Sequence, residues 1–148
     1  SVIGYPFRTT VNKKIIFTNG VFDILHEGHI ASLGEAATYG HILIVGLNSD
    51  ASVKRLKGDS RPINNEGSRS LLMASLVMVD AVILFEEDTP LNLITTILPD
   101  VLVKGGDYTI DQIVGAKEVM ANGGDVKIVP ILEGFSTTGI IEKMKAGK

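Results

Sequence analysis

Short apolar runs recur along the chain and are separated by segments in which apolar residues fall three or four positions apart. Within each run nearly every position is apolar, as in a strand of a parallel sheet that is covered on both faces. The runs occupy residues 14–19, 41–47, 81–85, 101–105 and 126–131. We therefore predict five buried strands.

The segments between these runs have a helical period and carry side chains suited to helix ends. They predict helices at residues 29–40, 49–56, 68–79, 90–98, 110–124 and 135–147. Ser68 is the expected N-cap of the third helix. Thr89 and Pro90 are the expected N-cap and first residue of the fourth. Ser136 or Thr137 is expected to cap the last helix.

Strands and helices that alternate in this way predict an α/β fold with a single Rossmann-like, doubly wound parallel five-stranded sheet. Residues 1–13 show no clear period and are expected to be an N-terminal arm or linker remnant, so that the domain covers residues 14–148. Ligands of such sheets bind outside the carboxyl ends of the strands. Those ends are rich here in Gly, Asp, Asn, Ser and Thr, which suits an anion or a nucleotide.

Composition narrows the class of protein further. A chain of 148 residues fits one domain, and 45% hydrophobic residues with a mean hydropathy of +0.27 argue against disorder. The net charge of −3 gives no reason to expect a nucleic-acid partner, and the absence of cysteine excludes disulfides and thiolate metal sites. The apolar runs are too short for a bilayer and no secretion signal is visible, so no membrane partner and a cytoplasmic location are expected.

Basic residues gather between the second strand and the third helix, although the protein is mildly acidic. They are Lys54, Arg55, Lys57, Arg61 and Arg69. A solvated loop and helix face is the ordinary interpretation of such a cluster. The other interpretation of the cluster is a surface that binds phosphate groups.

Two histidines, His26 and His29, lie one helical turn apart where the first strand gives way to a helix, with Gly28 between them. A zinc site needs three or four ligands, and the third histidine, His41, opens the second strand instead. Packing or helix capping is the usual explanation for such a pair. The strand end and the helix N-terminus favour phosphate binding, because imidazole N–H groups can donate hydrogen bonds to phosphate oxygens. The common glycine-rich nucleotide motifs are absent.

The run "GVFDILHEGHI" resembles the HxGH signature of the nucleotidyltransferase superfamily related to class I aminoacyl-tRNA synthetases. "GFSTTGII" resembles the second signature of that superfamily, ISSTxxR. From Lys14 onward the chain is similar to the adenylyltransferase domain of the ADP-heptose synthases, in "LNSDASVKRLKGDSRPIN", "VDAVILFEEDTP" and "LPDVLVKGGDY". That resemblance implies transfer of AMP from ATP to a heptose 1-phosphate, for bacterial lipopolysaccharide or related glycans, with Mg²⁺ bridging the phosphates.

The resemblance also implies roles for residues at matching positions. His26, His29 and Lys57 would be catalytic, with Lys54 as the alternative to Lys57. The nucleotide would be bound by Asn19, Gly20, Val21, Phe22, Asp23, Gly28, Gly105, Gly106, Asp107, Ser136, Thr137 and Thr138. The sugar phosphate would be bound by Asn48, Asp50, Lys54 and Arg69. No protein ligand to a metal is expected.

Two departures from the family pattern bear on these roles. The basic residue of the second signature falls near Ile141, so Lys57 or Arg69 is expected to supply that charge. Bifunctional members also carry a sugar kinase domain, which 148 residues cannot hold, so the chain is expected to be a stand-alone transferase or an excised domain. A homodimer or higher homo-oligomer is expected.

Two other functions remain open on the sequence. One is a cytidylyltransferase acting on glycerol 3-phosphate or a similar polyol phosphate, which shares the first signature and differs in its base pocket. The other is a non-catalytic module that senses nucleotides on the same fold.

Overall fold

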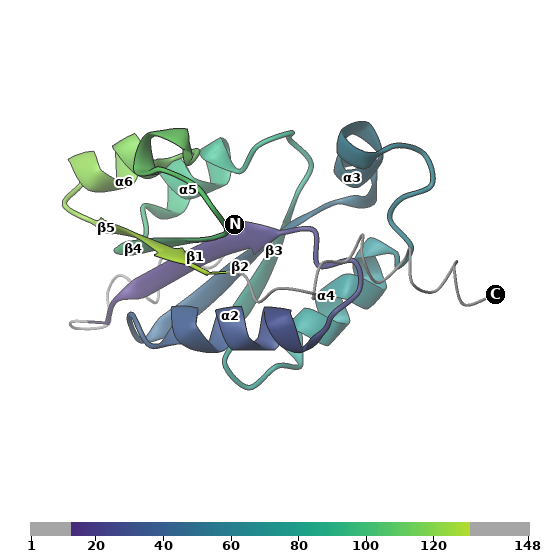
Figure 1. Ribbon diagram of the computed structural model, residues 1–148, viewed down its shortest axis with the longest axis horizontal. Coiled ribbons are helices and arrows are strands. Elements are labelled where there is room, and N and C mark those ends of the chain that lie inside the picture. Colours follow the sequence, from purple (N-terminus) through teal and green to yellow (C-terminus); the bar gives the residue numbers. More distant parts are fainter. Residues whose placement is uncertain (1–12, 131–148) are drawn as a thin grey trace.

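The five apolar runs form the strands of one parallel sheet in the computed structural model, which describes residues 13–130 (Figure 1). The strands are β1 (Ile15–Gly20), β2 (Ile42–Asn48), β3 (Ala81–Phe85), β4 (Val101–Gly105) and β5 (Asp125–Val129). They lie in the order β3-β2-β1-β4-β5, and every pairing is parallel. The predicted doubly wound sheet is therefore confirmed, and β1 lies at its centre.

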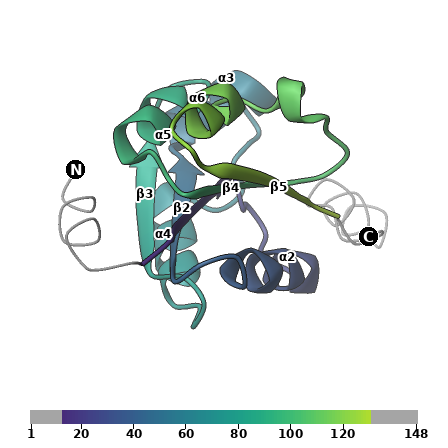
Figure 2. The same cartoon turned by 90° about the vertical axis from the view of Figure 1, so that its left-hand side faces the viewer.

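Helices cover both faces of the sheet, because every crossover between parallel strands must pass over one face. They are α2 (Glu27–Ala37), α3 (Asp50–Lys57), α4 (Glu66–Ala74), α5 (Leu91–Ile97), the 3-10 turn η1 (Ile110–Gln112) and α6 (Ala116–Ala121). Figures 1 and 2 show α2 and α4 on one face and α3, α5 and α6 on the other. Residues 131–148, with the predicted last helix and its caps, lie outside the described part.

Side chains of β1 alternate between two apolar clusters, one on each face of the sheet. Ile15 and Phe17 pack with Ile94 of α5, whereas Ile16 packs with Leu33 of α2 and with residues of α4. The aromatic ring of Phe17 lies where a side chain at Gly46 of β2 would begin, 2.6 Å from the position of its Cβ. Glycine at that position lets the largest core side chain of β1 lie flat over the neighbouring strand.

Several helix boundaries differ from the prediction. Asn65, not Ser68, caps α4: its side chain accepts the Ser68 backbone N–H at 2.8 Å, and the helix ends at Ala74 rather than at residue 79. Pro90 is the N-cap of α5, and Thr89 makes no capping hydrogen bond there. The predicted helix 110–124 is divided by Gly115, whose φ of +86° is left-handed. No helix within residues 13–130 is long and apolar enough to cross a bilayer.

Candidate active site

Two cavities open at the carboxyl ends of β1 and β4, the neighbouring strands at which the strand order reverses. This is where ligands bind in doubly wound sheets. The larger cavity has a volume of about 560 Å³ and the smaller about 220 Å³. The residues that line both of them are Asn19, Gly20, Val21, Phe22, His29 and Lys104. The two cavities therefore meet over the end of β1.

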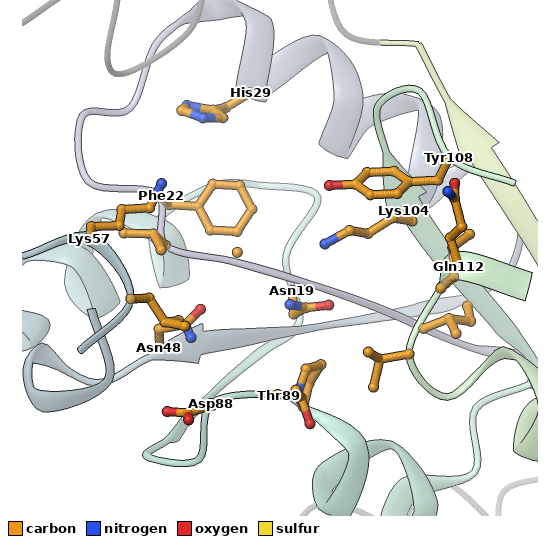
Figure 3. A pocket seen from close by; sticks show the side chains of 17 residues that line it. Asn19, Phe22, His29, Asn48, Lys57, Asp88, Thr89, Lys104, Tyr108 and Gln112 are labelled. Atoms are coloured by element: carbon orange, nitrogen blue, oxygen red, sulfur yellow. The ribbon is translucent and has the colours of Figure 1, made fainter. Parts of the chain in front are cut away.

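Different elements complete the two cavities. The larger one is also lined by the end of β2, by α3, by the loop after β3 and by the segment from Tyr108 through η1, which add polar side chains (Figure 3). Those side chains include Asn48, Lys57, Asp88, Thr89, Tyr108 and Gln112. The smaller one lies against α2 and is more apolar, with Leu33, Ala36, Val103 and Val129 beside His26, Gly28 and Gly105. The lining residues that were not predicted as site residues include Asp88, Thr89, Tyr108, Gln112 and Lys104.

His26 and His29 cap α2 reciprocally. The Nδ1 atom of His26 accepts the Gly28 backbone N–H at 3.2 Å, and the Nδ1 atom of His29 accepts the His26 backbone N–H at 3.3 Å. The two rings stack with their centroids 3.8 Å apart and their planes at 28°. The capping explanation of the pair thus holds, and both rings also line a cavity.

The capping geometry decides which nitrogen of each neutral ring carries the proton. An Nδ1 atom that accepts a hydrogen bond carries no proton, so the neutral ring is protonated on Nε2. Burial lowers the pKa of His26, and burial together with the charge of His26 lowers the pKa of His29 to about 4. At neutral pH His29 is therefore an uncharged ring that presents an Nε2–H donor.

Phe22 holds the His29 ring from the other side. Its ring meets that of His29 edge to face, with centroids 5.2 Å apart and planes at 69°. The backbone of Phe22 is left-handed, with φ of +49°, which is strained for a bulky residue. A Cβ at Gly20 would lie 2.8 Å from the Phe22 ring, so glycine is needed there. Strand end, aromatic ring and histidine thus form one packed unit.

Asp23 lies just before the histidines but does not point into either cavity. Its side chain is buried, and it accepts hydrogen bonds from Arg61 Nε at 2.8 Å and from the backbone N–H groups of Ile63 and Asn64 at 2.9 to 3.0 Å. Burial raises the pKa of Asp23, but the hydrogen bonds from Asn64, Ile63 and Arg61 outweigh it and lower the pKa below its ordinary value. Asp23 therefore anchors the loop before α4, and its predicted contact with the nucleotide stays a prediction.

Arg69 also contributes to the framework of the site. It is 1% exposed, and its guanidinium donates to Asn64 O at 2.9 Å, Val21 O at 3.0 Å and Asn48 O at 2.8 Å. A fourth bond reaches Asp50 Oδ1 at 2.7 Å. Neither Arg69 nor Asp50 is among the described residues that line the two cavities. The guanidinium ties the ends of β1 and β2 to α4, and the predicted contact of Arg69 with the sugar phosphate stays a prediction.

Other predicted residues are distributed as follows. Asn48, Lys57, Gly28 and Gly105 line a cavity, whereas Lys54, Gly106 and Asp107 line neither among the described residues. Gly106 follows β4 directly, has a φ of +122° and donates its N–H to Val129 O of β5 at 3.0 Å. Ser136, Thr137, Thr138 and Ile141 lie outside the described residues.

Lys104 is the unpredicted residue that lines both cavities and carries a charge. It stands one position before the predicted Gly105, in a strand that is otherwise apolar. A lysine near the end of a buried strand at the switch point is a sequence signal that could have indicated it. Burial lowers the pKa of Lys104, and its Nζ atom lies 5.5 Å from the centroid of the Tyr108 ring.

Within residues 13–130, no three His, Cys, Asp or Glu side chains are grouped so as to hold a metal ion. Asp88, which lines the larger cavity, is paired with Arg55, and Asp23 is paired with Arg61. The described residues therefore do not form a cage for Mg²⁺.

Comparison with known proteins identifies several similar chains. A family model described as cytidylyltransferase-like matches residues 17–143. Relatives named bifunctional protein HldE are 54% identical over 138 residues in Geotalea uraniireducens and 59% identical over 133 residues in Haemophilus influenzae PittGG. These alignments cover 93% and 90% of this chain but only 28% of each relative.

Solved structures add a similar fold. The lipopolysaccharide core biosynthesis protein from Thermoplasma volcanium GSS1 is 35% identical, with a TM-score of 0.66, over 81% of this chain and 97% of that one. A pantoate-beta-alanine ligase from Francisella tularensis matches over 95% of this chain and 72% of that one, with a TM-score of 0.58 and 16% identity. The second match concerns the fold alone.

Proposed function

The chain belongs to the cytidylyltransferase-like family, and from that premise we propose that it is an adenylyltransferase joining AMP from ATP to a heptose 1-phosphate. The products are ADP-heptose and pyrophosphate. One observation carries the proposal: two cavities meet at His29 and Lys104, so that two substrates can be held with their phosphates together. The choice of ATP and heptose rests on the resemblance of "LNSDASVKRLKGDSRPIN" and "LPDVLVKGGDY" to the ADP-heptose synthases.

The reaction needs little covalent help from the protein. A phosphate oxygen of the sugar phosphate attacks the α-phosphorus of ATP, the bond from that phosphorus to the bridging oxygen breaks, and pyrophosphate leaves. A phosphate monoester has a second pKa of about 6, so the attacking oxygen is already deprotonated at neutral pH. The protein has to align two anions and stabilise the charge that develops.

We assign the nucleotide to the smaller cavity and the sugar phosphate to the larger one. The smaller cavity is apolar along Leu33, Val103 and Val129, which suits a flat base, and Gly105 allows close approach. The larger cavity offers Asn48, Thr89 and Gln112, whose hydrogen-bonding groups suit a sugar with several hydroxyls. The α-phosphate then lies where the cavities meet, beside the N-terminus of α2, where anions are favoured.

His29 is the donor that we assign to the α-phosphate. Its Nδ1 atom is held by the backbone N–H of His26, so its Nε2–H is fixed as a donor before substrate binds. His26 caps the same helix and stacks on His29, which keeps the ring in place. Lys57, at the end of α3, supplies positive charge on the side of the sugar phosphate. Mg²⁺ is expected to be held by phosphate oxygens, because the described residues do not form a cage for it.

Several wider expectations belong to the same proposal. The relatives are named bifunctional and this chain spans 28% of their length, which supports a sugar kinase domain in a longer parent protein. We further propose a cytoplasmic homodimer or higher homo-oligomer.

Pyrophosphate release from the 148-residue chain tests the function. ATP or CTP is offered in turn with heptose 1-phosphate and with glycerol 3-phosphate, and turnover is expected with ATP and heptose 1-phosphate. Turnover with CTP and glycerol 3-phosphate instead would identify the cytidylyltransferase. ATP binding without turnover on any acceptor would identify a nucleotide sensor.

A further inference from the structure

Lys104 is the cation that the two cavities share among the described residues. It is the penultimate residue of β4, and both cavity linings include it. Figure 3 shows its side chain below the Tyr108 ring, pointing into the larger cavity on the side of Asn19 and Phe22. The remaining residues common to both linings are uncharged at neutral pH, because the pKa of His29 is about 4.

The surroundings of Lys104 leave its ammonium group without a carboxylate among residues 13–130. Its recorded contact there is with the Tyr108 ring, which Nζ faces at 5.5 Å. Withdrawing an ammonium group from water is unfavourable unless a ligand or a charged partner compensates it. A partly buried lysine in a cavity wall therefore indicates an anionic ligand.

The other basic residues near the cavities are already engaged or lie at the edge. Arg61 pairs with Asp23, Arg69 with Asp50, and Arg55 with Asp88 at 3.0 Å. Lys57 lines only the larger cavity and is exposed. Lys104 is thus the cation placed to act on both substrates.

We propose that Lys104 is a catalytic residue whose ammonium group binds the phosphates of both substrates where the cavities meet. This inference rests on the proposed transferase function. Lys104 draws the attacking phosphate toward the α-phosphorus and offsets the repulsion between the two anions. It also supplies positive charge that the second signature lacks at Ile141. No proton is transferred, because the attacking oxygen is already deprotonated.

The test compares Lys104→Met with the matched variant Lys127→Met. Lys127 lies on the adjacent strand β5 with its Nζ 5.8 Å from the centroid of the Tyr39 ring, and it lines neither cavity. With both substrates saturating, Lys104→Met is expected to lower kcat by about 10²-fold or more, as loss of one preorganised donor does. Lys127→Met is expected to keep kcat within about twofold, since it removes a surface contact only.

The outcomes separate the two proposals. A wild-type chain without turnover on any substrate pair refutes the proposed function, whatever Lys104 does. An active wild type with unchanged kcat in Lys104→Met overturns this inference alone, as does a loss confined to the KM for ATP. Thermal unfolding of both variants checks that they are folded. If Lys104→Met does not fold, Lys104→Gln is measured in its place, with the same expected loss and the same result overturning the inference.

Discussion

Replacing Arg69 by methionine tests the assignment of this buried guanidinium to the framework of the site. Methionine keeps much of the length and apolar volume of the side chain but removes the charge and all its donors. Four hydrogen bonds are lost, three to backbone carbonyl groups and one to Asp50. The ends of β1 and β2 would then no longer be tied to α4.

The expected loss in the free energy of unfolding depends on whether those acceptors can form other hydrogen bonds. Hydrogen bonds that involve a charged group contribute about 1.5–3 kcal/mol each, so a simple sum for four bonds gives about 6–12 kcal/mol. That sum is too large, because the Asp50 side chain is 33% exposed and can be hydrated again. Removing one partner of a buried ion pair costs about 3–5 kcal/mol, which is the loss we expect. It is a large share of the stability of a domain, typically about 5–15 kcal/mol.

Urea unfolding followed by circular dichroism gives the free energy of unfolding of Arg69→Met. Lys54→Met is the control, because it removes an exposed cation of α3 and should change the free energy by no more than about 0.5 kcal/mol. A loss below about 1 kcal/mol in Arg69→Met, together with a raised KM for the sugar phosphate, would refute the framework role. Arg69 would then return to the substrate-binding residues that the sequence predicts.

Three further substitutions or titrations test the site and the core. His29→Ala is expected to lower kcat by about 10²-fold or more while the protein stays folded. The control His41→Ala removes the acceptor of the Lys14 N–H at the far end of the sheet and should leave kcat unchanged. Equal activity of the two variants would argue against a catalytic His29. A proton NMR titration should give His29 a pKa of about 4 against 6.5 in the unfolded chain. As the pH falls, the unfolded chain therefore takes up a proton on His29 before the folded chain does. The contribution of the neutral His29 ring to stability is complete above pH 6.5 and is lost as the pH falls to about 4. A measured pKa near 6.5 would contradict the buried, neutral ring. Gly46→Ala should destabilise the domain by about 1–3 kcal/mol in urea unfolding, because its Cβ would meet the Phe17 ring. An unchanged urea midpoint of unfolding would show that the Phe17 ring moves aside without cost.

The strands could be predicted from sequence because each is buried on both faces and so is apolar at almost every position. The predicted bounds of the strand 81–85 match those of β3. The ends of the helices were harder to predict from sequence, because each end depends on a single contact. Ser68 has the right residue type for a cap, yet Asn65 three residues earlier accepts the Ser68 backbone N–H, so the helix already begins at Glu66. Gly115 divides a predicted helix with its left-handed φ of +86°, and Ile94, from another helix, leaves no room for a Cβ there, at 2.8 Å.

The candidate site could be located from sequence but its polar residues could not be assigned individually. Strand ends converge on one edge, so Asn19, Phe22 and Gly105 were expected near a ligand. The pairs that hold the loops together join distant positions, such as Asp23 with Arg61 and Arg69 with Asp50. No local pattern shows which charge meets which, so paired residues and substrate ligands look alike in the sequence. Only the fold separates Arg69, which is enclosed, from Lys104, which faces the cavities.

The histidine pair shows why capping and phosphate binding should not be treated as rival explanations. Capping uses the Nδ1 atoms of His26 and His29, and this use leaves the proton of His29 on Nε2, in a ring that lines both cavities. Burial in the same packed unit lowers the pKa of His29 to about 4, so the donor stays neutral over the range in which phosphate esters are dianionic. A neutral donor with one fixed tautomer needs no reorganisation when charge develops on the α-phosphate. The positive charge must then come from elsewhere, which is the part that Lys57 and Lys104 are placed to supply.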